Sequence, residues 1–361
     1  MKIICTFDLI LRDKRMDIAF IIPKRVNRGP VLVVLELVRQ LLLHNHHCKV
    51  YYMDEGGELS FPCETEYLSF SQTIDFNRYD IVHTHGIRPD IYAFYHKPLS
   101  CKAKLVSTMH NYILRDLAYE YNKVVAQVFG RVWLWSLKRH DKIVTLSQDA
   151  LGYYRSFLPE SKLAYVYNTR SLDQTKVLPQ ALREQIIAFK GDSFLIGANA
   201  ILTKRKGIDQ LIKVLPGLPF CKLLVVGEGK EKIGLENLCV EMGVTDRVLF
   251  LGYQEDAYRF LPYYDLFAMP SRSEGFGLTI LEAAQYHKRL LCSDIPIFRE
   301  LLTEKETVFF TLENEESLRK AILYLKDHPE KGDCLYERYE QYFSPECFYR
   351  GYEKIYNSLL D

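Results

Sequence analysis

The sequence Pro270-Ser-Arg-Ser-Glu-Gly-Phe-Gly277 joins an apolar run, Leu266 to Met269, to an amphipathic segment, Leu278 to Tyr286. The run has strand length and the segment has helix length, so the octapeptide predicts a loop between a buried strand and a helix. In open α/β sheets such loops bind ligands, because free N–H groups and the positive end of the helix dipole attract anions. Gly275 and Gly277 allow the backbone to approach a ligand closely. The stretch therefore predicts an α/β protein with a diphosphate site in its second half.

Two glutamates flank the glycines of this loop. Glu274 belongs to the loop itself, and Glu282, eight residues later, lies more than one turn into the predicted helix. Carboxylates at these two depths suit hydroxyl recognition better than metal binding, because each can accept a pair of hydrogen bonds from neighbouring hydroxyls of a sugar or ribose. The structural alternative is that Glu274 caps the helix while Glu282 lies on a solvated face.

Apolar runs of strand length alternate with helix-length segments along the whole chain, which is typical of parallel sheets built from βα units. The expected strands form two series: residues 17–22, 48–53, 81–85, 104–108, 142–147 and 163–167, and then 194–198, 222–226, 248–251, 266–269 and 289–292. Two series predict two doubly wound domains. We expect a first domain over residues 1–170, a linker over 171–193, a second domain over 194–342 and a C-terminal helix over 343–361.

The composition is that of a soluble globular protein, with 48% hydrophobic and 26% charged residues among 361. The net charge of +1 argues against a dedicated nucleic-acid binder, although residues 1–170 sum to +6 and residues 171–361 to −5. The nine cysteines are scattered, without any Cys-x-x-Cys, so we expect no disulfide framework or zinc site. The start makes a poor signal peptide and no apolar run would span a bilayer, which predicts a cytoplasmic protein. Residues 1–15 either form an extension with an edge strand or precede a natural start at Met16.

A second loop that could approach a ligand follows the first expected strand, over Pro23 to Pro30. Gly29 would let the backbone come close to a phosphate, and Pro30 suits the first position of the following helix. The loop also carries three basic side chains: Lys24, Arg25 and Arg28. The alternative is an ordinary turn with solvated basic residues.

The segment from Glu274 to Glu282, E-G-F-G-L-T-I-L-E, resembles the E-x7-E signature of retaining glycosyltransferases of family 4. Other resemblances follow from about Met16 to the end: Lys206–Ile212 to K-G-x-D-x-L-I, Val225–Gly229 to V-G-x-G, Leu249–Gly252 to the strand before the base-binding loop, and Phe343–Pro345 to the C-terminal segment. The family has the GT-B fold: two facing doubly wound Rossmann-like domains and a C-terminal helix that crosses back to the first domain. The resemblance implies that fold here.

The resemblance also implies roles for individual residues. Glu282 would bind the donor ribose, and Glu274 a hydroxyl of the transferred sugar. His110, in Thr-Met-His-Asn after an expected strand, matches the histidine that faces the reaction centre. Lys206 would hold the donor diphosphate, and Gly29 would approach it from the first domain. The amides of the loop and of the helix start would complete the donor site: Gly275, Phe276, Gly277 and Leu278.

Two departures from the family pattern concern the diphosphate. The family usually has an arginine five residues before the motif lysine, and Ile201 stands at that position here. Lys204 or Arg205 would have to replace the lost charge, although a lysine is not equivalent to a guanidinium fork. The second departure is that Gly29 is followed by Pro30, where many members have paired glycines.

The implied function is transfer of a sugar, with retention, from a nucleotide diphosphate donor to an acceptor hydroxyl. A UDP-sugar is the family's commonest donor, and a surface polysaccharide or a lipid-linked glycan is the expected product. We expect no cofactor and no metal, because the chain has no Asp-x-Asp pair to hold a divalent ion. The alternatives are a noncatalytic nucleotide-sugar-binding protein and a nucleotide-sugar epimerase. The sugar, the base, the acceptor and the oligomeric state stay open.

An aromatic and basic stretch, Ile113 to Lys142, contains both tryptophans, Trp133 and Trp135. Such a helix suits an anionic membrane surface, which would attach the protein peripherally to the inner face of the membrane. The alternative is a helix packed into the core of the first domain. Histidines also occur at 44, 46 and 47 beside Cys48, where we expect a solvated turn rather than a metal site. At 83 and 85 we expect a structural role, and the alternatives are a place in the substrate cleft for one of them or a metal.

Overall fold

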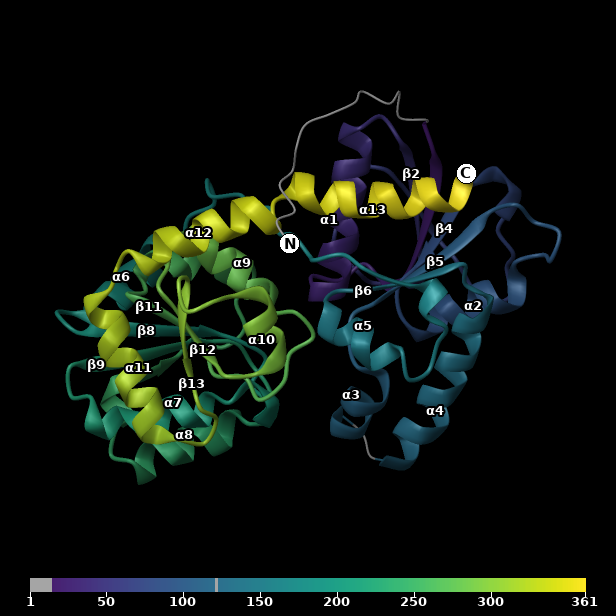
Figure 1. The fold of residues 1–361 in the computed structure, drawn as a ribbon. Helices are drawn as coiled ribbons and strands as arrows, with labels where there is room; N and C mark the ends of the chain where they lie inside the picture. Colours follow the sequence, from purple (N-terminus) through teal and green to yellow (C-terminus); the bar gives the residue numbers. More distant parts are fainter. Residues whose placement is uncertain (1–14, 121–122) are drawn as a thin grey trace. The chain divides into compact units, whose positions relative to one another are not determined.

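The structure is a computed structural model that describes residues 15–120 and 123–361 (Figure 1). The expected extension over residues 1–15 therefore lies almost wholly outside the described residues, as does Tyr121 of the aromatic stretch. The chain forms two compact units: one contains residues up to Thr108 with Val132–Ile143 and Lys354–Asp361, and the other contains Met109–Arg131 and Val144–Glu353. The domain limits expected from the sequence stay predictions.

The first sheet has seven strands in the order β3-β2-β1-β4-β5-β6-β7. Its strands are β1 (Asp17–Lys24), β2 (His47–Asp54), β3 (Glu64–Tyr67), β4 (Ile81–Thr84), β5 (Lys104–Met109), β6 (Lys142–Thr145) and β7 (Leu163–Tyr165). The helices among them are α1 (Gly29–Leu43), α2 (Ile87–His96), α3 (Ile113–Glu120), α4 (Lys123–Ser136) and α5 (Gln148–Tyr154). β1 pairs in parallel with β2 and with β4, and Phe20 lies opposite Val50 and His83.

The second sheet has six strands in the order β10-β9-β8-β11-β12-β13. Its strands are β8 (Phe194–Asn199), β9 (Cys221–Val226), β10 (Val248–Phe250), β11 (Leu266–Met269), β12 (Leu290–Ser293) and β13 (Thr307–Phe310). The helices are α6 (Gln180–Lys190), α7 (Ile208–Val214), α8 (Lys232–Glu241), α9 (Leu278–Gln285), α10 (Pro296–Leu301), α11 (Glu315–Asp327), α12 (Lys331–Tyr342) and α13 (Pro345–Leu360). Short 3-10 turns include η4 (Lys204–Lys206) and η7 (Ala257–Tyr263).

The second sheet is apolar on both faces. Alternate residues of one strand enter two different apolar clusters: Leu224 belongs to one, and its neighbours Leu223 and Val225 belong to the other. Successive side chains of a strand point to opposite faces, so each face of this sheet is covered by helices. Both sheets are parallel and of Rossmann-like type, which confirms the fold class expected from the sequence.

Residues 171–193, for which the sequence predicts a linker, contain α6. Ile186 on this helix and Leu178 just before it are buried in an apolar cluster that also contains Leu195 and Phe260. The segment has a polar composition because only a narrow face of α6 packs against the apolar cluster, and the composition therefore did not indicate a helix.

The end of α13 belongs to the same compact unit as the first strands. Tyr356 is fully buried there, and its hydroxyl lies 2.7 Å from Nδ1 of His83, whose Nε2 lies 2.8 Å from the Thr108 hydroxyl. The rings of His83 and His85 are 4.3 Å apart. The two histidines thus form part of the packing beneath the C-terminal helix, as the structural interpretation predicts.

Candidate functional site

The candidate donor site lies where the strand order of the second sheet reverses. β8 and β11 are neighbours, although β9 and β10 intervene in the sequence. The loops that follow these two strands leave from the same edge, which is where open α/β sheets bind ligands. The loops touch: a Cβ on Gly207, whose φ is +68°, would lie 2.0 Å from the Pro270 carbonyl oxygen. Only glycine fits there, because both the space and the left-handed backbone exclude other side chains.

Two cations and one hydroxyl hold the buried Glu274 carboxylate. Lys206 Nζ lies 2.5 Å and the Ser271 hydroxyl 2.7 Å from Oε1, and Arg205 Nη1 lies 3.5 Å from Oε2. Burial raises the pKa of Glu274, but the charges of Lys206 and Arg205 outweigh burial and leave the pKa below its usual value. Glu274 does not cap the next helix, because Gly277 is the cap residue of α9 and no side chain caps that helix. The carboxylate is therefore ionised at neutral pH.

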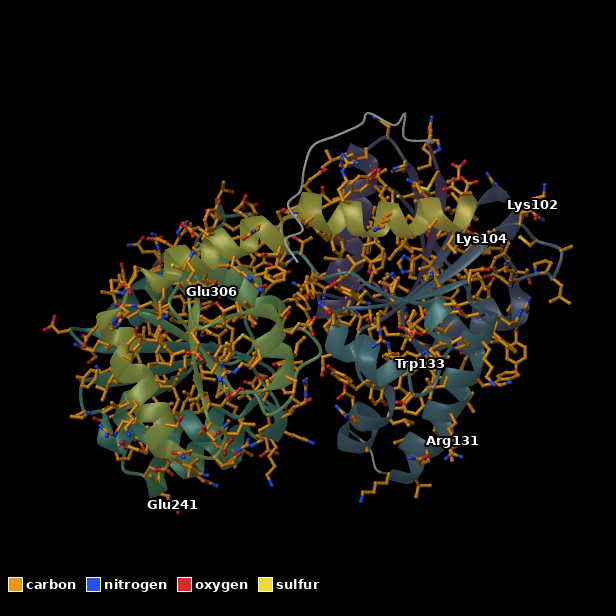
Figure 2. The ribbon with its side chains drawn as sticks, in the orientation of Figure 1. Lys102, Lys104, Arg131, Trp133, Glu241 and Glu306 are labelled. Carbon is orange, nitrogen blue, oxygen red and sulfur yellow. The ribbon has the colours of Figure 1, made fainter. Side chains whose placement is uncertain are left out.

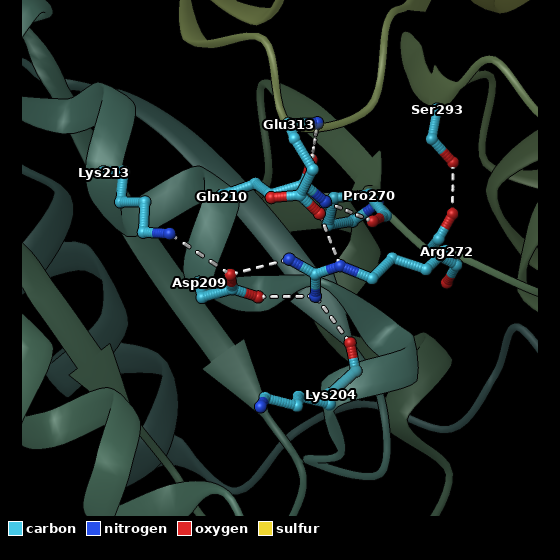
Figure 3. A network of polar contacts seen from close by, with 9 residues as sticks. Lys204, Asp209, Gln210, Lys213, Pro270, Arg272, Ser293 and Glu313 are labelled. Atoms are coloured by element: carbon cyan, nitrogen blue, oxygen red, sulfur yellow. Dashed lines mark hydrogen bonds and ion pairs between the residues drawn. The ribbon is translucent and has the colours of Figure 1, made fainter. Parts of the chain in front are cut away.

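Arg272 fastens the Glu274 loop to the loop that carries Lys206 (Figure 3). Its guanidinium donates to both carboxylate oxygens of Asp209, at 2.9 and 2.8 Å, and to Glu313 Oε1 at 2.6 Å. It also donates to the Lys204 carbonyl at 2.6 Å, and the Arg272 N–H donates to the Arg205 carbonyl at 2.7 Å. The bidentate pair fixes the register between the two loops.

Glu282 lies buried on α9 rather than on a solvated face. Its Oε1 is 3.3 Å from Nε of Arg170, a buried residue that follows β7. Burial raises the pKa of the Glu282 carboxyl, and the charge of Arg170 counteracts this only in part. Arg170 belongs to none of the motifs found in the sequence. Its signal was its place three residues after the expected strand over 163–167, at the carboxyl end where ligands bind.

His110 lies beside the E-x7-E loop. It follows β5 directly, and a Cβ on Gly275 would lie 2.6 Å from the His110 carbonyl oxygen. Desolvation lowers the pKa of the His110 imidazole well below its usual value, so the ring is neutral at pH 7. Phe276 is buried, with its ring centroid 6.3 Å from that of Tyr167 and 6.1 Å from that of Phe343. Its side chain serves packing, and only its backbone is available to a ligand.

Lys204 and Arg205 were the candidates to replace the arginine that is absent at position 201, and of these two only Arg205 lies near Glu274. Ile201 is 62% exposed, and Lys204 is exposed as well. In Figure 3 the Lys204 ammonium points away from the Arg272 guanidinium. Arg205 and Lys206 are the two that reach Glu274. Gly29 is the first residue of α1, directly after the cap residue Arg28, and it belongs to the other compact unit.

The histidines at 44, 46 and 47 have separate partners. His44 Nδ1 lies 2.9 Å from the Gln40 carbonyl, His46 Nδ1 accepts from the Met16 N–H at 3.2 Å, and His47 Nδ1 lies 3.0 Å from Asp17 Oδ1. Within the described residues no three histidine, cysteine or acidic side chains form a group that could hold a metal ion.

The two tryptophans of α4 differ in environment. Trp133 is 7% exposed and its indole N–H donates to Asp90 Oδ2 at 2.5 Å, whereas Trp135 is 45% exposed. Arg131, two residues before Trp133, is exposed (Figure 2). Trp133 therefore fits the core interpretation of this helix, and Trp135 lies at the surface. None of the helices in the described part of the chain has the length and apolar content needed to cross a bilayer.

Known proteins are similar to this chain over nearly its whole length. The profile of the family "Glycosyl transferases group 1" matches residues 180–342, and that of "Glycosyltransferase Family 4" matches residues 28–174. The O-antigen biosynthesis glycosyltransferase WclY of Escherichia coli is 33% identical over 354 residues, which cover 96% of this chain and 99% of WclY.

Two solved structures show the same fold. HepE from Anabaena, in complex with UDP and glucose, has a TM-score of 0.79 at 17% identity, covering 95% of this chain and 100% of HepE. WaaG, a glycosyltransferase involved in lipopolysaccharide biosynthesis, has a TM-score of 0.68 at 16% identity, covering 95% of this chain and 99% of WaaG. Two doubly wound sheets and these structural neighbours define the GT-B fold. The chain belongs to the group 1 glycosyltransferases.

Proposed function

We propose that this protein transfers a sugar, with retention, from a UDP-sugar to an acceptor hydroxyl during surface polysaccharide synthesis. The observation that carries the proposal is the pair of buried carboxylates, Glu274 and Glu282, each held by a cation at the ligand-binding edge of the second sheet. Two fixed carboxylates at different depths suit the hydroxyls of a sugar and of a ribose. Neither the noncatalytic alternative nor the epimerase accounts better for this pair.

In the proposed reaction, the bond between the anomeric carbon and the phosphate oxygen breaks as the acceptor oxygen bonds to the same face of the sugar. The acceptor proton passes to the departing phosphate oxygen. The leaving diphosphate gains negative charge, so nearby cations and amides lower the barrier by electrostatic stabilisation. Lys206, Arg205 and the first amides of α9 would supply that stabilisation, without a metal ion. Neutral His110 would donate or accept a hydrogen bond at a sugar hydroxyl.

The choice of donor and pathway is supported by the relatives. HepE binds UDP and glucose, and WclY acts in the biosynthesis of O-antigen, a surface polysaccharide. Incubation of the purified protein with a panel of UDP-sugars and candidate acceptors, with mass spectrometry of products, tests the proposal. Free UDP together with a glycosylated acceptor would support it. Tight binding without turnover would favour the noncatalytic protein, and an isomerised nucleotide sugar would favour the epimerase.

We also propose that the protein works at an anionic membrane surface, through a face of α4. Val124, Val128, Val132 and Trp135 follow one another at helical spacing and, with Phe129, are 44% to 73% exposed. Residues 123–140 contain four lysine or arginine residues and no acidic one. Tyr95 extends this surface from α2, with its ring centroid 6.5 Å from that of Trp135. Apolar and aromatic side chains among cations suit an interfacial helix on anionic lipid.

A further inference from the structure

The guanidinium of Arg170 contacts both Glu282 and the ring of Tyr258. Its guanidinium Nε lies 3.3 Å from Glu282 Oε1, and the guanidinium carbon lies 5.9 Å from the centre of the Tyr258 ring. The side chains of Arg170 and Glu282 are only 10% and 11% exposed. A guanidinium in this setting is stacked and paired, and it is not a freely rotating surface cation.

The backbone of Arg170 is fixed by the same helix that carries Glu282. The Arg170 carbonyl accepts from Gln285 Nε2 at 2.7 Å and from the Tyr339 hydroxyl at 3.0 Å. Gln285 lies three residues after Glu282 on α9, and Tyr339 lies on α12. α9 thus holds both ends of Arg170: its carbonyl through Gln285 and its guanidinium through Glu282.

Other charged and titratable groups around Glu282 do not replace Arg170. Asp256, before η7, adds to the rise in the pKa of the Glu282 carboxyl that burial causes, and Arg170 lowers it. The phenol of Tyr286, at the end of α9, is neutral at pH 7, since burial raises its pKa further. Tyr258 lies beneath the Arg170 guanidinium and is neutral for the same reason. Arg170 is therefore the cation that favours a charged Glu282.

We infer that Arg170 is a positioning residue of the donor site, which holds the Glu282 carboxylate oriented to accept the hydroxyls of the donor ribose. This inference rests on the proposed function, because it takes the ribose as the ligand of Glu282. A carboxylate must be ionised and fixed to accept two hydrogen bonds, and a cation on one of its oxygens serves both needs.

The test is the affinity for UDP, measured by titration calorimetry between pH 5.5 and 8 for the wild type, Arg170→Met and Arg170→Lys. Without the cation, Glu282 binds a proton at higher pH, so the loss of affinity in Arg170→Met should be largest at low pH. For a rise of one pKa unit at Glu282 we expect a loss approaching about tenfold at pH 6 and a smaller loss at pH 8. Arg170→Lys should recover part of the affinity. Since UDP itself titrates near pH 6, each variant is compared with the wild type at the same pH.

A double-mutant cycle separates positioning from a folding defect. In a Glu282→Gln background, Arg170→Met should change the UDP affinity little, because the group that Arg170 positions no longer titrates. Arg319→Met is the matched control, since Arg319 pairs with Glu316 on the exposed surface of α11. The inference would be overturned if Arg170→Met lost no UDP affinity or lost it equally at every pH. It would also be overturned if Arg170→Met reduced the affinity as much in the Glu282→Gln background as in the wild type. A wild type that binds no UDP would instead count against the proposed function.

Discussion

Glu274 and Glu282 are eight residues apart, but the structure gives their carboxyl groups opposite pKa shifts. Both are buried, which raises the pKa of each. Two cations and a hydroxyl more than compensate at Glu274, whereas one cation compensates only in part at Glu282. As the pH falls, Glu282 is therefore the first of the two to be protonated.

At Glu282 we expect the substitution Glu282→Ala to weaken the binding of UDP. A buried pair of ribose hydroxyls would lose its acceptor, at a cost of about 1 to 3 kcal/mol. Titration calorimetry with UDP alone measures the change. Glu241→Ala, at an exposed position on α8, is the control that should bind UDP like the wild type. Unchanged affinity in Glu282→Ala would remove this residue from the site.

The three consecutive cations at 204–206 should differ in their effect on turnover. Lys206→Ala should lower kcat most, and Arg205→Ala should lower it by at least about tenfold, or roughly 1.4 kcal/mol. The reason is that both side chains reach Glu274, beside which negative charge would develop on the leaving group. Lys204→Ala is the matched control and should retain nearly full turnover. A loss in Lys204→Ala equal to that in Lys206→Ala would contradict this order.

How far the sequence predicts the candidate site depends on whether the residues lie in one segment. Glu274, Gly277 and Glu282 share one strand-loop-helix unit, so their spacing along the chain indicates that Glu274 lies in the loop and Glu282 more than one turn into the helix. The pairing of Arg170 with Glu282 joins residues 112 positions apart, and only the tertiary fold brings them together. Nothing in the spacing of either segment indicates that contact.

In α4 each of the two interpretations of the aromatic stretch fits one tryptophan: Trp133 fits a helix packed into the core, and Trp135 fits a helix with an exposed surface. Trp133 packs inward, and Trp135 lies outward with its ring centroid 4.0 Å from that of Phe94. Two residues turn a helix by more than half a revolution, so opposite environments are expected. Composition alone could not assign the two rings to different faces.

If this exposed face binds membranes, Val128→Asp should reduce binding to anionic vesicles. A charge in the middle of the stripe opposes insertion among lipid headgroups and repels anionic lipid. Cosedimentation with anionic and with neutral vesicles measures the effect, and added salt should weaken binding to the anionic ones. Val240→Asp, at an exposed position on α8, is the control. Equal binding of wild type and Val128→Asp, or none of either, would contradict the proposed face.

Asp90 on α2 should make stability depend on pH. Burial raises its pKa to about 6, and hydrogen bonds from Thr84, Trp133 and Ser107 lower it less than burial raises it. Because the folded state prefers the protonated acid, this stabilisation is complete below pH 3.8 and is lost as the pH rises through 6. A shift of about two units corresponds to roughly 3 kcal/mol.

Denaturant unfolding of the wild type and Asp90→Asn, between pH 4.5 and 7, measures this contribution. The unfolding free energy of the wild type should fall with rising pH relative to that of Asp90→Asn, whose side chain does not titrate. Parallel pH profiles for the two proteins would contradict the raised pKa.

At the level of elements, the sequence missed one edge strand of each sheet and found the other, β7 and β10. β3 (Glu64–Tyr67) is largely exposed and has the sequence Glu-Thr-Glu-Tyr, without the apolar run of a central strand. β13 (Thr307–Phe310) has only four residues. Edge strands are often short and half solvated, so a search for apolar runs can pass over them, as it does at β3 and β13.

For the whole molecule, we expect turnover to persist when divalent metal ions are removed. The proposed charge stabilisation comes from Lys206, Arg205 and helix amides, which chelators do not affect. The rate of UDP release in the presence of EDTA, compared with the rate after Mg²⁺ or Mn²⁺ is added back, measures this. Turnover that EDTA abolishes and either ion restores would require a different account of the leaving group.

The burial of Tyr356 beside His83 has a consequence for biosynthesis. Residues 354–361 complete the same compact unit as the first strands of the chain. At about 5 to 20 residues per second, translation needs roughly 10 to 45 seconds to proceed from residue 143 to residue 361. Throughout that interval the nascent chain displays the apolar surface that α13 will later cover. The unit whose first strands emerge first from the ribosome is therefore completed only when its last helix has been made.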